Sequence, residues 1–258
     1  MQSINYEAIK VSKDSQEKFI DSVVTEAPLQ ININNEPYTV VMRTPGDDEY
    51  LIRGLLFAED IYRNSDPLNF KNIDTTKNHF STIDVTISKE MLGKGYMNKR
   101  TLLSVSSCGI CGKQSLNDLK VVGKKLTSSL SIDINTVEQM FNKMKSHQKV
   151  FKKTGASHAA SIFDSNYNLL SIKEDIGRHN AVDKSIGNLL ETNSLKKSKY
   201  LLVSGRVSYE IVTKAFIAKI PTIIAVSGCS SLAIDFSKEF RINLIGFSRN
   251  SKLTIYSK

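Results

Sequence analysis

Residues 200–230, YLLVSGRVSYEIVTKAFIAKIPTIIAVSGCS, decide the fold class. Their two apolar runs, Tyr200-Leu201-Leu202-Val203 and Ile223-Ile224-Ala225-Val226, are nearly continuous, which is typical of central strands covered on both faces. The residues between the runs, 208–219, predict a helix. A strand, a helix and a further strand in this order predict an α/β layer with a mixed, largely parallel sheet.

The alternation of strands and helices continues on both sides of this stretch. Upstream, an apolar face formed by Val182, Ile186 and Leu189 predicts a helix. The other elements predicted in this half are strands 158–163 and 168–173, helix 231–240, and strands 242–247 and 253–256. We therefore expect residues 131–258 to form the main α/β domain.

The first half of the chain is richer in strand patterns. Apolar and polar residues alternate over 30–34 and 38–42 around Asn34-Asn35, which predicts a β-hairpin. Asp47-Asp48 then offers an N-cap for a helix, and residues 83–87 predict another strand. We expect residues 1–130 to form a smaller, β-rich lobe, with the alternative that its N-terminal strands join the main sheet.

Two further elements connect the halves. Leu102, Leu103 and Val105 predict a strand that leads into a Ser- and Gly-rich loop with two cysteines. Residues 135–151 predict one helix, which opens with a capping box formed by Asn135 and Glu138.

Composition restricts the class of protein. The 258 residues carry a net charge of +9, and 40% of them are hydrophobic. We expect no membrane-spanning segment and no secretory signal. The three cysteines, an odd number, do not indicate a set of structural disulfide bonds, so we predict a cytoplasmic protein. The positive charge favours an anionic partner. Because the lysines are dispersed and no RNP-like motif is present, a phosphorylated small molecule is expected rather than nucleic acid.

Three predicted strands end in small or cationic residues: Ser204-Gly205-Arg206, Ser227-Gly228-Cys229-Ser230, and Gly246 to Lys252. Ligands of open α/β sheets bind beyond the carboxyl ends of the strands, where helix N-termini favour anions. We therefore predict a phosphate or diphosphate site at this edge. Ordinary turn chemistry is the alternative for each single loop, and no nucleotide-binding glycine fingerprint is present.

Residues 174–180, Glu-Asp-Ile-Gly-Arg-His-Asn, place many polar groups between a strand and a helix. Arg178 and His179 are candidates for binding or polarising a ligand. The alternative is that Asn180 caps the helix, Arg178 pairs with a carboxylate and His179 is polar surface. His158 is a weaker candidate and is expected to be structural.

Cys108-Gly109-Ile110-Cys111 is the candidate reactive motif. Structural zinc is disfavoured, because Cys229 is distant and no compact pair of His ligands is present. Two alternatives remain open from the spacing: a dithiol redox centre, and a nucleophile that carries sulfur as a persulfide on an accessible thiolate.

Four motifs resemble the formate dehydrogenase accessory sulfurtransferase family, FdhD. The resemblance extends through Ser204-Gly205-Arg206 to Gly246-Phe247-Ser248-Arg249. The four motifs are residues 42–49 (MRTPGDDE), 106–113 (SSCGICGK), 154–160 (TGASHAA) and 174–184 (EDIGRHNAVDK).

The resemblance implies a fold and an activity. The main domain is expected to be three-layered and cytidine-deaminase-like, without the deaminase zinc, in a homodimer. The protein is expected to receive persulfide sulfur from a cysteine desulfurase on Cys108, assisted by Cys111 through relay or resolution. The acceptor is expected to be the molybdenum or tungsten bis(molybdopterin guanine dinucleotide) cofactor of formate dehydrogenase, which GDP should mimic.

The cofactor contacts are expected on the segment that matches the family's binding stretch: Phe247, Ser248, Arg249, Asn250, Ser251 and Lys252. Two other functions stay open, a non-catalytic chaperone for the cofactor and a thiol-disulfide oxidoreductase. Cys229 departs from the expected pattern and is interpreted as a buried small hydrophobe.

Overall fold

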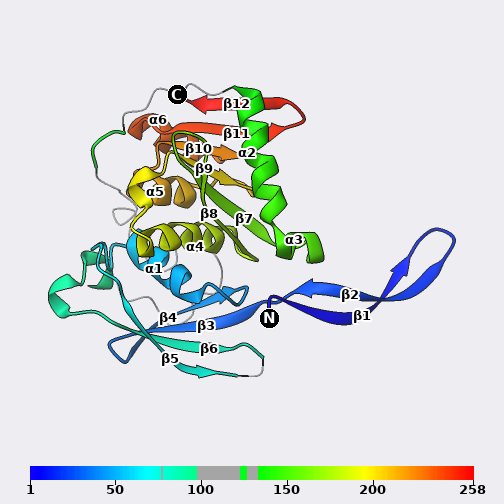
Figure 1. The fold of residues 1–258 in the computed structure, drawn as a ribbon, viewed down its shortest axis with the longest axis horizontal. Coiled ribbons are helices and arrows are strands. Elements are labelled where there is room, and N and C mark those ends of the chain that lie inside the picture. Colours follow the sequence, from blue (N-terminus) through cyan, green and yellow to red (C-terminus); the bar gives the residue numbers. More distant parts are fainter. Residues whose placement is uncertain (77, 98–122, 127–132) are drawn as a thin grey trace.

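Two β-sheets stacked through intervening helices form the body of the protein, and a two-stranded arm projects from it (Figure 1). The structure is a computed structural model that describes residues 1–76, 78–97, 123–126 and 133–258. The predicted strand at residues 102–105 and the cysteine pair at 108 and 111 lie outside the described residues.

The main sheet has six strands in the order β12-β11-β10-β9-β7-β8. Its strands are β7 (His158–Phe163), β8 (Leu169–Asp175), β9 (Tyr200–Val203), β10 (Thr222–Ala225), β11 (Asn243–Arg249) and β12 (Lys252–Ser257). Every predicted strand of this half is confirmed. The expectation of a largely parallel sheet is wrong, because only β9, β10 and β11 pair in parallel. The hairpins β7–β8 and β11–β12 force antiparallel pairing, and β7 also pairs antiparallel with β9.

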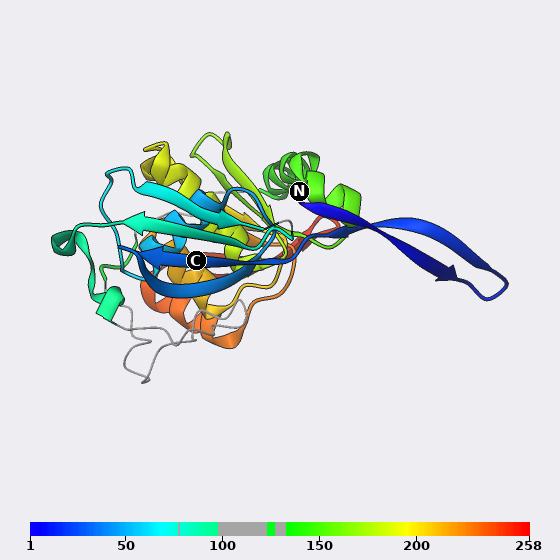
Figure 2. The same ribbon diagram turned by 90° about the horizontal axis from the view of Figure 1, so that it is seen from below.

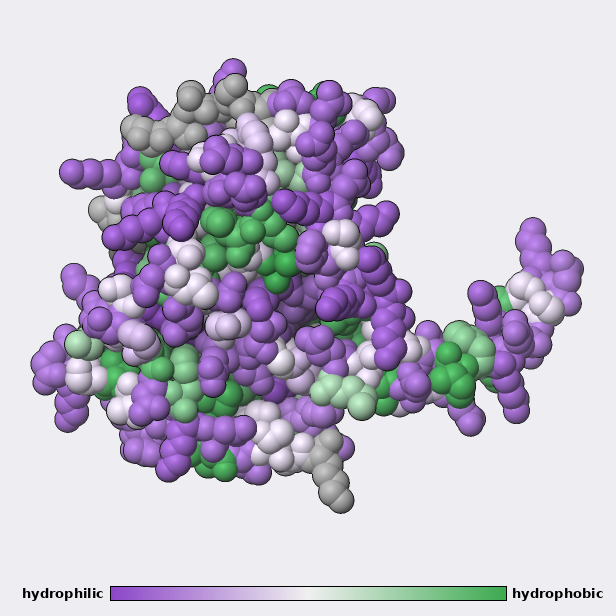
Figure 3. All heavy atoms as spheres, in the orientation of Figure 1, coloured by the Kyte–Doolittle hydropathy of each residue, from purple (hydrophilic) through white to green (hydrophobic). Residues whose placement is uncertain are grey.

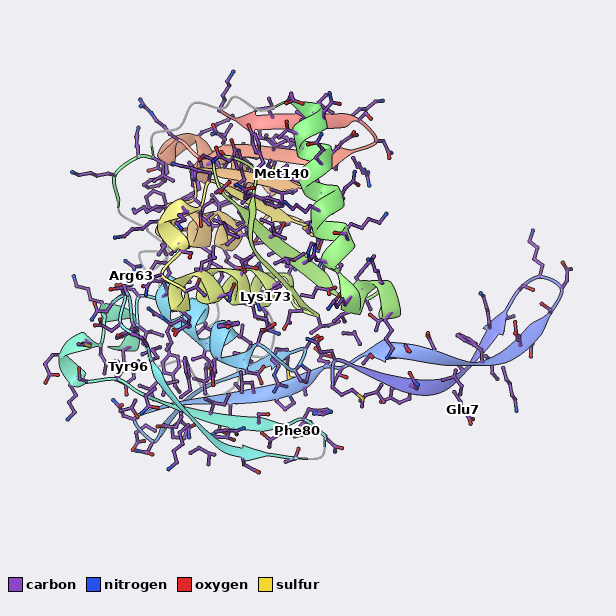
Figure 4. All side chains as sticks on the ribbon, in the orientation of Figure 1. Glu7, Arg63, Phe80, Tyr96, Met140 and Lys173 are labelled. Atoms are coloured by element: carbon purple, nitrogen blue, oxygen red, sulfur yellow. The ribbon has the colours of Figure 1, made fainter. Side chains whose placement is uncertain are left out.

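Helices cover both faces of this sheet. Leu201 and Val203 of β9 pack with α4 (Arg178–Glu191), α5 (Tyr209–Ile217) and α6 (Ser231–Phe240), whereas Leu202 points to the opposite face. That face is covered by α2 (Ile134–His147), whose Met140 is labelled in Figure 4. The expected three layers are confirmed, and the likeness to cytidine deaminases stays a prediction.

The helix expected over 135–151 is two helices, α2 and α3 (Lys149–Thr154). The chain leaves helical geometry at Gln148, where ψ is 78°. A carboxylate then caps the start of α3, because the amides of Val150 and Phe151 donate to Glu174 at 2.9 and 2.8 Å. The predicted capping box is also wrong. The N-cap is Asp133, whose Oδ1 accepts from the Thr136 amide at 3.0 Å.

The N-terminal half builds its own four-stranded sheet, in the order β4-β3-β6-β5, and does not join the main one. In the predicted hairpin, Asn34 and Asn35 both have positive φ, as a two-residue type I′ turn requires. The elements of this half are β3 (Ala27–Ile33), β4 (Glu36–Arg43), α1 (Asp48–Ala58), β5 (Asn69–Thr75), β6 (Ser81–Thr86) and the short 3-10 turns Lys89–Met91 and Lys94–Met97. The sequence patterns predict all but β5 and the two turns.

Helix α1 joins the two sheets. One face of α1 packs on the small sheet through Leu51, Ile52, Leu55 and Leu56, and another crosses α4. The crossing is closest at two glycines. A Cβ on Gly54 would lie 2.0 Å from the Asp183 carbonyl oxygen, and one on Gly187 would lie 1.9 Å from that of Tyr50. Backbone approaches backbone here, so the two halves are held in direct contact.

The arm consists of β1 (Ser3–Val11) and β2 (Gln16–Val24), which pair with each other and with no other described strand (Figure 2). The sequence patterns did not predict it. Residues 4–8 alternate between apolar and polar side chains, but the pattern stops at Ile9, and β2 has adjacent apolar residues at 19–20 and 23–24. Among the described helices, none is long and apolar enough to cross a membrane.

Candidate functional site

Four strands deliver their carboxyl ends to one edge of the main sheet. Strands β9, β10 and β11 run in parallel, and β8 runs the same way because β7 is antiparallel to both β8 and β9. The segments after β8, β9 and β10 therefore meet at this edge, together with the end of β11 (Figure 1). The start of β7 lies there too. We call these residues the carboxyl edge.

The first part of the carboxyl edge is formed around Gly205. A Cβ on Gly205 would lie 3.1 Å from His158 Nδ1 and 3.4 Å from Arg178 Cβ. Ser204 Oγ accepts from the Ala159 amide at 2.9 Å and lies 3.4 Å from His158 Nδ1. The structure thus brings Ser204, Gly205 and Arg178 together, as predicted from the strand-end pattern. Arg206 follows with an exposed side chain.

The second part is a contact between Gly228 and Phe247. A Cβ on Gly228 would lie 2.9 Å from Phe247 Cζ, so the ring lies against the glycine backbone. Phe247 has a φ of 50° and is 43% exposed. An aromatic residue in the left-handed region is uncommon and costs about 1–2 kcal/mol. Its amide donates to the Ser227 carbonyl at 3.1 Å, which joins the ends of β10 and β11.

Residues 246–252 are more regular than a strand-end loop. Strand β11 continues to Arg249, with a bulge between Gly246 and Arg249, and turns tightly into β12. Asn250 and Ser251 both have positive φ, which closes a two-residue hairpin. Ser251 Oγ donates to Glu138 of α2 at 2.9 Å. In the predicted binding segment Ser248 is buried, whereas the other members are exposed: Phe247, Arg249, Asn250, Ser251 and Lys252.

Two buried polar atoms at the carboxyl edge have no hydrogen-bond partner among the described residues. They are Arg178 Nε and Ser248 Oγ. A buried donor without a partner is costly, and the predicted pairing of Arg178 with a carboxylate is not found in the described part of the chain. The exposed cations Arg206, Arg249 and Lys252 add charge nearby. This arrangement can accept an anion.

His158 lies at the carboxyl edge, although the sequence patterns predict only a structural role for it. Burial and the neighbouring Arg178 guanidinium lower the pKa of its imidazole below the ordinary value of 6.5. The imidazole is therefore neutral at neutral pH and able to both donate and accept a hydrogen bond. The signal was its position at the first residue of β7, which begins where β8 and β9 end.

His179 is not polar surface, because its side chain is buried between the starts of two helices. It is buried at 4% exposure, with Nε2 lying 2.9 Å from Ser208 Oγ and 3.0 Å from Glu210 Oε2. Its contacts tie the start of α4 to the start of α5. Below them, Lys214 Nζ and Asp183 form a second buried pair at 2.6 Å.

The rest of the 174–184 motif holds the two halves together. Asp175 and Lys184 are both fully buried and form an ion pair at 2.7 Å. Asp175 also accepts from the Thr44 amide at 3.1 Å, and Lys184 donates to the Thr44 carbonyl at 2.8 Å. Asn180 is not a cap, because its Nδ2 donates to the Met42 carbonyl at 2.8 Å. Residues 42–49 and residues 174–184 are therefore joined by hydrogen bonds between the two halves of the chain.

Cys229, predicted to be a buried small hydrophobe, is partly buried and packs against the core. Burial raises the pKa of its thiol to about 11. Its sulfur lies 3.2 Å from where a Cβ on Gly246 would be, which fits a small apolar filler. Among the described residues, no group of three or more His, Cys, Asp or Glu side chains is placed to hold a metal ion.

The chain is similar to known proteins over its full length. The FdhD/NarQ family model matches residues 24–258, so most of the arm precedes the matched segment. A "Sulfur carrier protein FdhD" of Picrophilus torridus is 39% identical, covering 100% of this chain and 97% of that protein.

Two further proteins support the assignment. Another "Sulfur carrier protein FdhD", of Streptomyces avermitilis, is 36% identical, covering 92% of this chain and 87% of that protein. The crystal structure of a formate dehydrogenase accessory protein from Desulfotalea psychrophila has the same fold, with a TM-score of 0.78 and 19% identity, covering 100% of this chain and 98% of that one. The chain belongs to the FdhD/NarQ family.

Proposed function

We propose that this protein is a sulfurtransferase that supplies sulfur to the cofactor of a formate dehydrogenase. Cys108 receives the sulfur as a persulfide from a cysteine desulfurase. The acceptor is the bis(molybdopterin guanine dinucleotide) cofactor, bound as a substrate at the carboxyl edge. Support comes from the family, whose relatives carry the name sulfur carrier protein. The observation that carries the placement is the meeting of Gly205, Arg178, Gly228 and Phe247 at one edge.

The proposed chemistry uses two cysteines. The Cys108 thiolate attacks the terminal sulfur of the donor persulfide, and the donor cysteine leaves as its thiolate with the electron pair of the broken S–S bond. The Cys111 thiolate then attacks Cys108 Sγ, which forms a disulfide between them and expels the sulfur as hydrosulfide. A cellular thiol reduces the disulfide and restores the protein.

The carboxyl edge suits the guanine dinucleotide ends of the cofactor. Arg178 Nε, which has no hydrogen-bond partner in the described part of the chain, lies at an edge that also carries Arg206 and Arg249, so a diphosphate would be bound by charge-assisted hydrogen bonds. The exposed ring of Phe247, held over Gly228, offers a flat surface for stacking a purine. His158, kept neutral, would orient a phosphate or ribose oxygen.

The proposed working form is a cytoplasmic homodimer. Its partners are the cysteine desulfurase as donor and a formate dehydrogenase as client. The names of the sulfur carrier relatives and of the solved formate dehydrogenase accessory protein support the link to a formate dehydrogenase.

Calorimetric titration with GDP tests the binding part of the proposal. We expect the wild type to bind GDP, with affinity at least about tenfold lower in Arg178→Gln and in Phe247→Ala. Arg241→Gln is the matched control, since Arg241 ends α6 before β11 begins, at the other end of the strands. Unchanged affinity in both edge variants would refute this site.

The same titration separates sulfur transfer from a chaperone role. Cys108→Ala protein should still bind GDP but should leave formate dehydrogenase inactive in cells that lack the wild-type gene. If that variant restores dehydrogenase activity, the thiol is dispensable and the protein is a non-catalytic chaperone.

A further inference from the structure

The arm, residues 3–24, is the part of the fold that the proposed chemistry does not use. Its strands pair from Ser3↔Val24 to Val11↔Gln16, and Figures 1 and 2 both show it extending away from the body. Glu7, labelled in Figure 4, lies far from either sheet. A two-stranded hairpin alone is only marginally stable in water. An arm of this length is therefore expected to pack on another surface.

One face of the arm combines aromatic and aliphatic side chains with the carboxylates of Glu17 and Asp21. In an antiparallel pair, directly opposed residues share a face, so the pairs Ile4↔Val23 and Ala8↔Phe19 lie on the same side as Tyr6. Tyr6 is 55% exposed, and Ile4, Phe19 and Val23 are 37%, 37% and 39% exposed. We call this side the Tyr6 face. Apolar side chains are visible on the arm in Figure 3. The opposite side carries Glu7 and Lys18 together with the exposed aliphatic residues Ile9, Val11 and Ile20, and it has no aromatic residue.

A surface that complements the Tyr6 face exists on the same chain. The end of α2 and all of α3 expose Phe151 at 42% within a basic stretch that has no acidic residue from 139 to 154. We call it the α3 surface. Its exposed lysines are Lys143, Lys145, Lys149, Lys152 and Lys153.

The charges of the two surfaces are opposite. The arm carries Glu7, Asp14, Glu17 and Asp21 against three lysines, on a chain whose net charge is +9. The body without the arm therefore carries +10, so two bodies repel each other unless a less basic surface lies between them. The arm is such a surface, and its Tyr6 face presents aromatic rings and the carboxylates of Glu17 and Asp21 to Phe151 and the lysines of the α3 surface.

We propose that the occupant of the Tyr6 face is a second copy of this chain, with each arm lying on the α3 surface of its partner. Each arm already contacts its own α3 where it joins the body, so a two-fold axis near α3 places the free part of each arm across the neighbour. Such an isologous interface buries both surfaces twice. The inference rests on the dimeric state proposed above and not on the sulfur chemistry.

Sedimentation velocity of the full-length protein tests the interface. We expect a dimer for the wild type, and a rise of at least about tenfold in the dimer dissociation constant for Tyr6→Ser/Phe19→Ser and for Phe151→Ser/Lys153→Glu. Ile9→Ser is the matched control, because Ile9 is 58% exposed on the opposite side of the arm. A monomeric wild type, or a dimer that the arm variant does not weaken, would overturn the proposal.

Mixing the two double variants gives the sharper result. Neither variant can form an intact contact with itself, but a mixed pair regains one, between the wild-type arm of one chain and the wild-type α3 surface of the other. The mixture should therefore form heterodimers at concentrations where each variant alone is monomeric. A mixture that stays monomeric contradicts the pairing of arm with α3. GDP binding by each variant shows that the fold and the carboxyl edge are unchanged.

Discussion

At the scale of single residues, the motifs that carry the family resemblance have two roles: some of their residues form the candidate binding site, and others hold the two halves of the chain together. Arg178 belongs to the carboxyl edge, whereas Asp175 and Lys184, a few positions away, bind the first half of the chain. Both roles require charged or polar side chains at fixed positions. A sequence pattern alone therefore cannot separate the ligand-binding residue from its structural neighbours.

Removing Lys184 should destabilise the protein strongly. Lys184→Met leaves the fully buried Asp175 carboxylate without its cation, which is expected to lower the free energy of unfolding by about 3–5 kcal/mol. Urea unfolding followed by circular dichroism measures it. The control is Lys173→Met, because Lys173 pairs with Asp47 near the surface and should cost below about 1 kcal/mol. Equal losses in the two variants would contradict the structural role.

Cys229 should be the unreactive thiol. With its pKa raised to about 11 by burial, it remains protonated at neutral pH, and the thiolate is the reactive form. Iodoacetamide labelling read by peptide mass spectrometry should leave Cys229 unmodified at neutral pH and label it only as the pH approaches 11. Labelling of Cys229 as fast as that of free cysteine at neutral pH would refute the assignment.

His158 should make stability depend on pH in a defined direction. Its folded pKa lies below the unfolded value of 6.5, so the unfolded chain takes up the proton first. Stability is therefore present above that value and is lost as the pH falls below it. His158→Gln should flatten this acid limb in urea unfolding. Parallel curves for wild type and His158→Gln would be the contrary result.

At the scale of elements, the sequence predicts strands and helices of the second half well because each has a strong apolar period. The errors fall where a distant side chain decides the local geometry. Glu174 caps α3 and ends the preceding helix, although it lies on β8. The arm could not be predicted, because its short alternation over residues 4–8 is not matched in β2, whose faces are not set by a buried core.

The crossing of α1 and α4 should not tolerate a methyl group. In Gly187→Ala, the new Cβ would lie 1.9 Å from the Tyr50 carbonyl oxygen, which is backbone and cannot turn aside. We expect the loss to reach the upper part of the about 1–3 kcal/mol range of overpacked sites, despite the better helix propensity of Ala. Thermal unfolding measures it, with Asn188→Ala as the control on α4. A Gly187→Ala protein as stable as the wild type would show that the helices are less close.

At the scale of the whole molecule, two halves of the chain combine into one body, and the candidate site lies on the larger sheet. The strand-end residues of the site could be predicted, since parallel strands must end at a common edge. The partnership of His158 and Arg178 around Gly205 could not, because 20 positions separate the first two and no local pattern joins them. The fit of the arm to a second copy likewise needs the three-dimensional placement.

The central claim is that Cys108 carries sulfur. The direct measurement is mass spectrometry of the purified protein after incubation with a cysteine desulfurase and free cysteine. The account predicts one added sulfur atom on the peptide that contains Cys108, present in Cys229→Ala protein and absent from Cys108→Ala protein. Added sulfur on Cys229, or an unmodified Cys108 peptide while formate dehydrogenase is still activated, would contradict it.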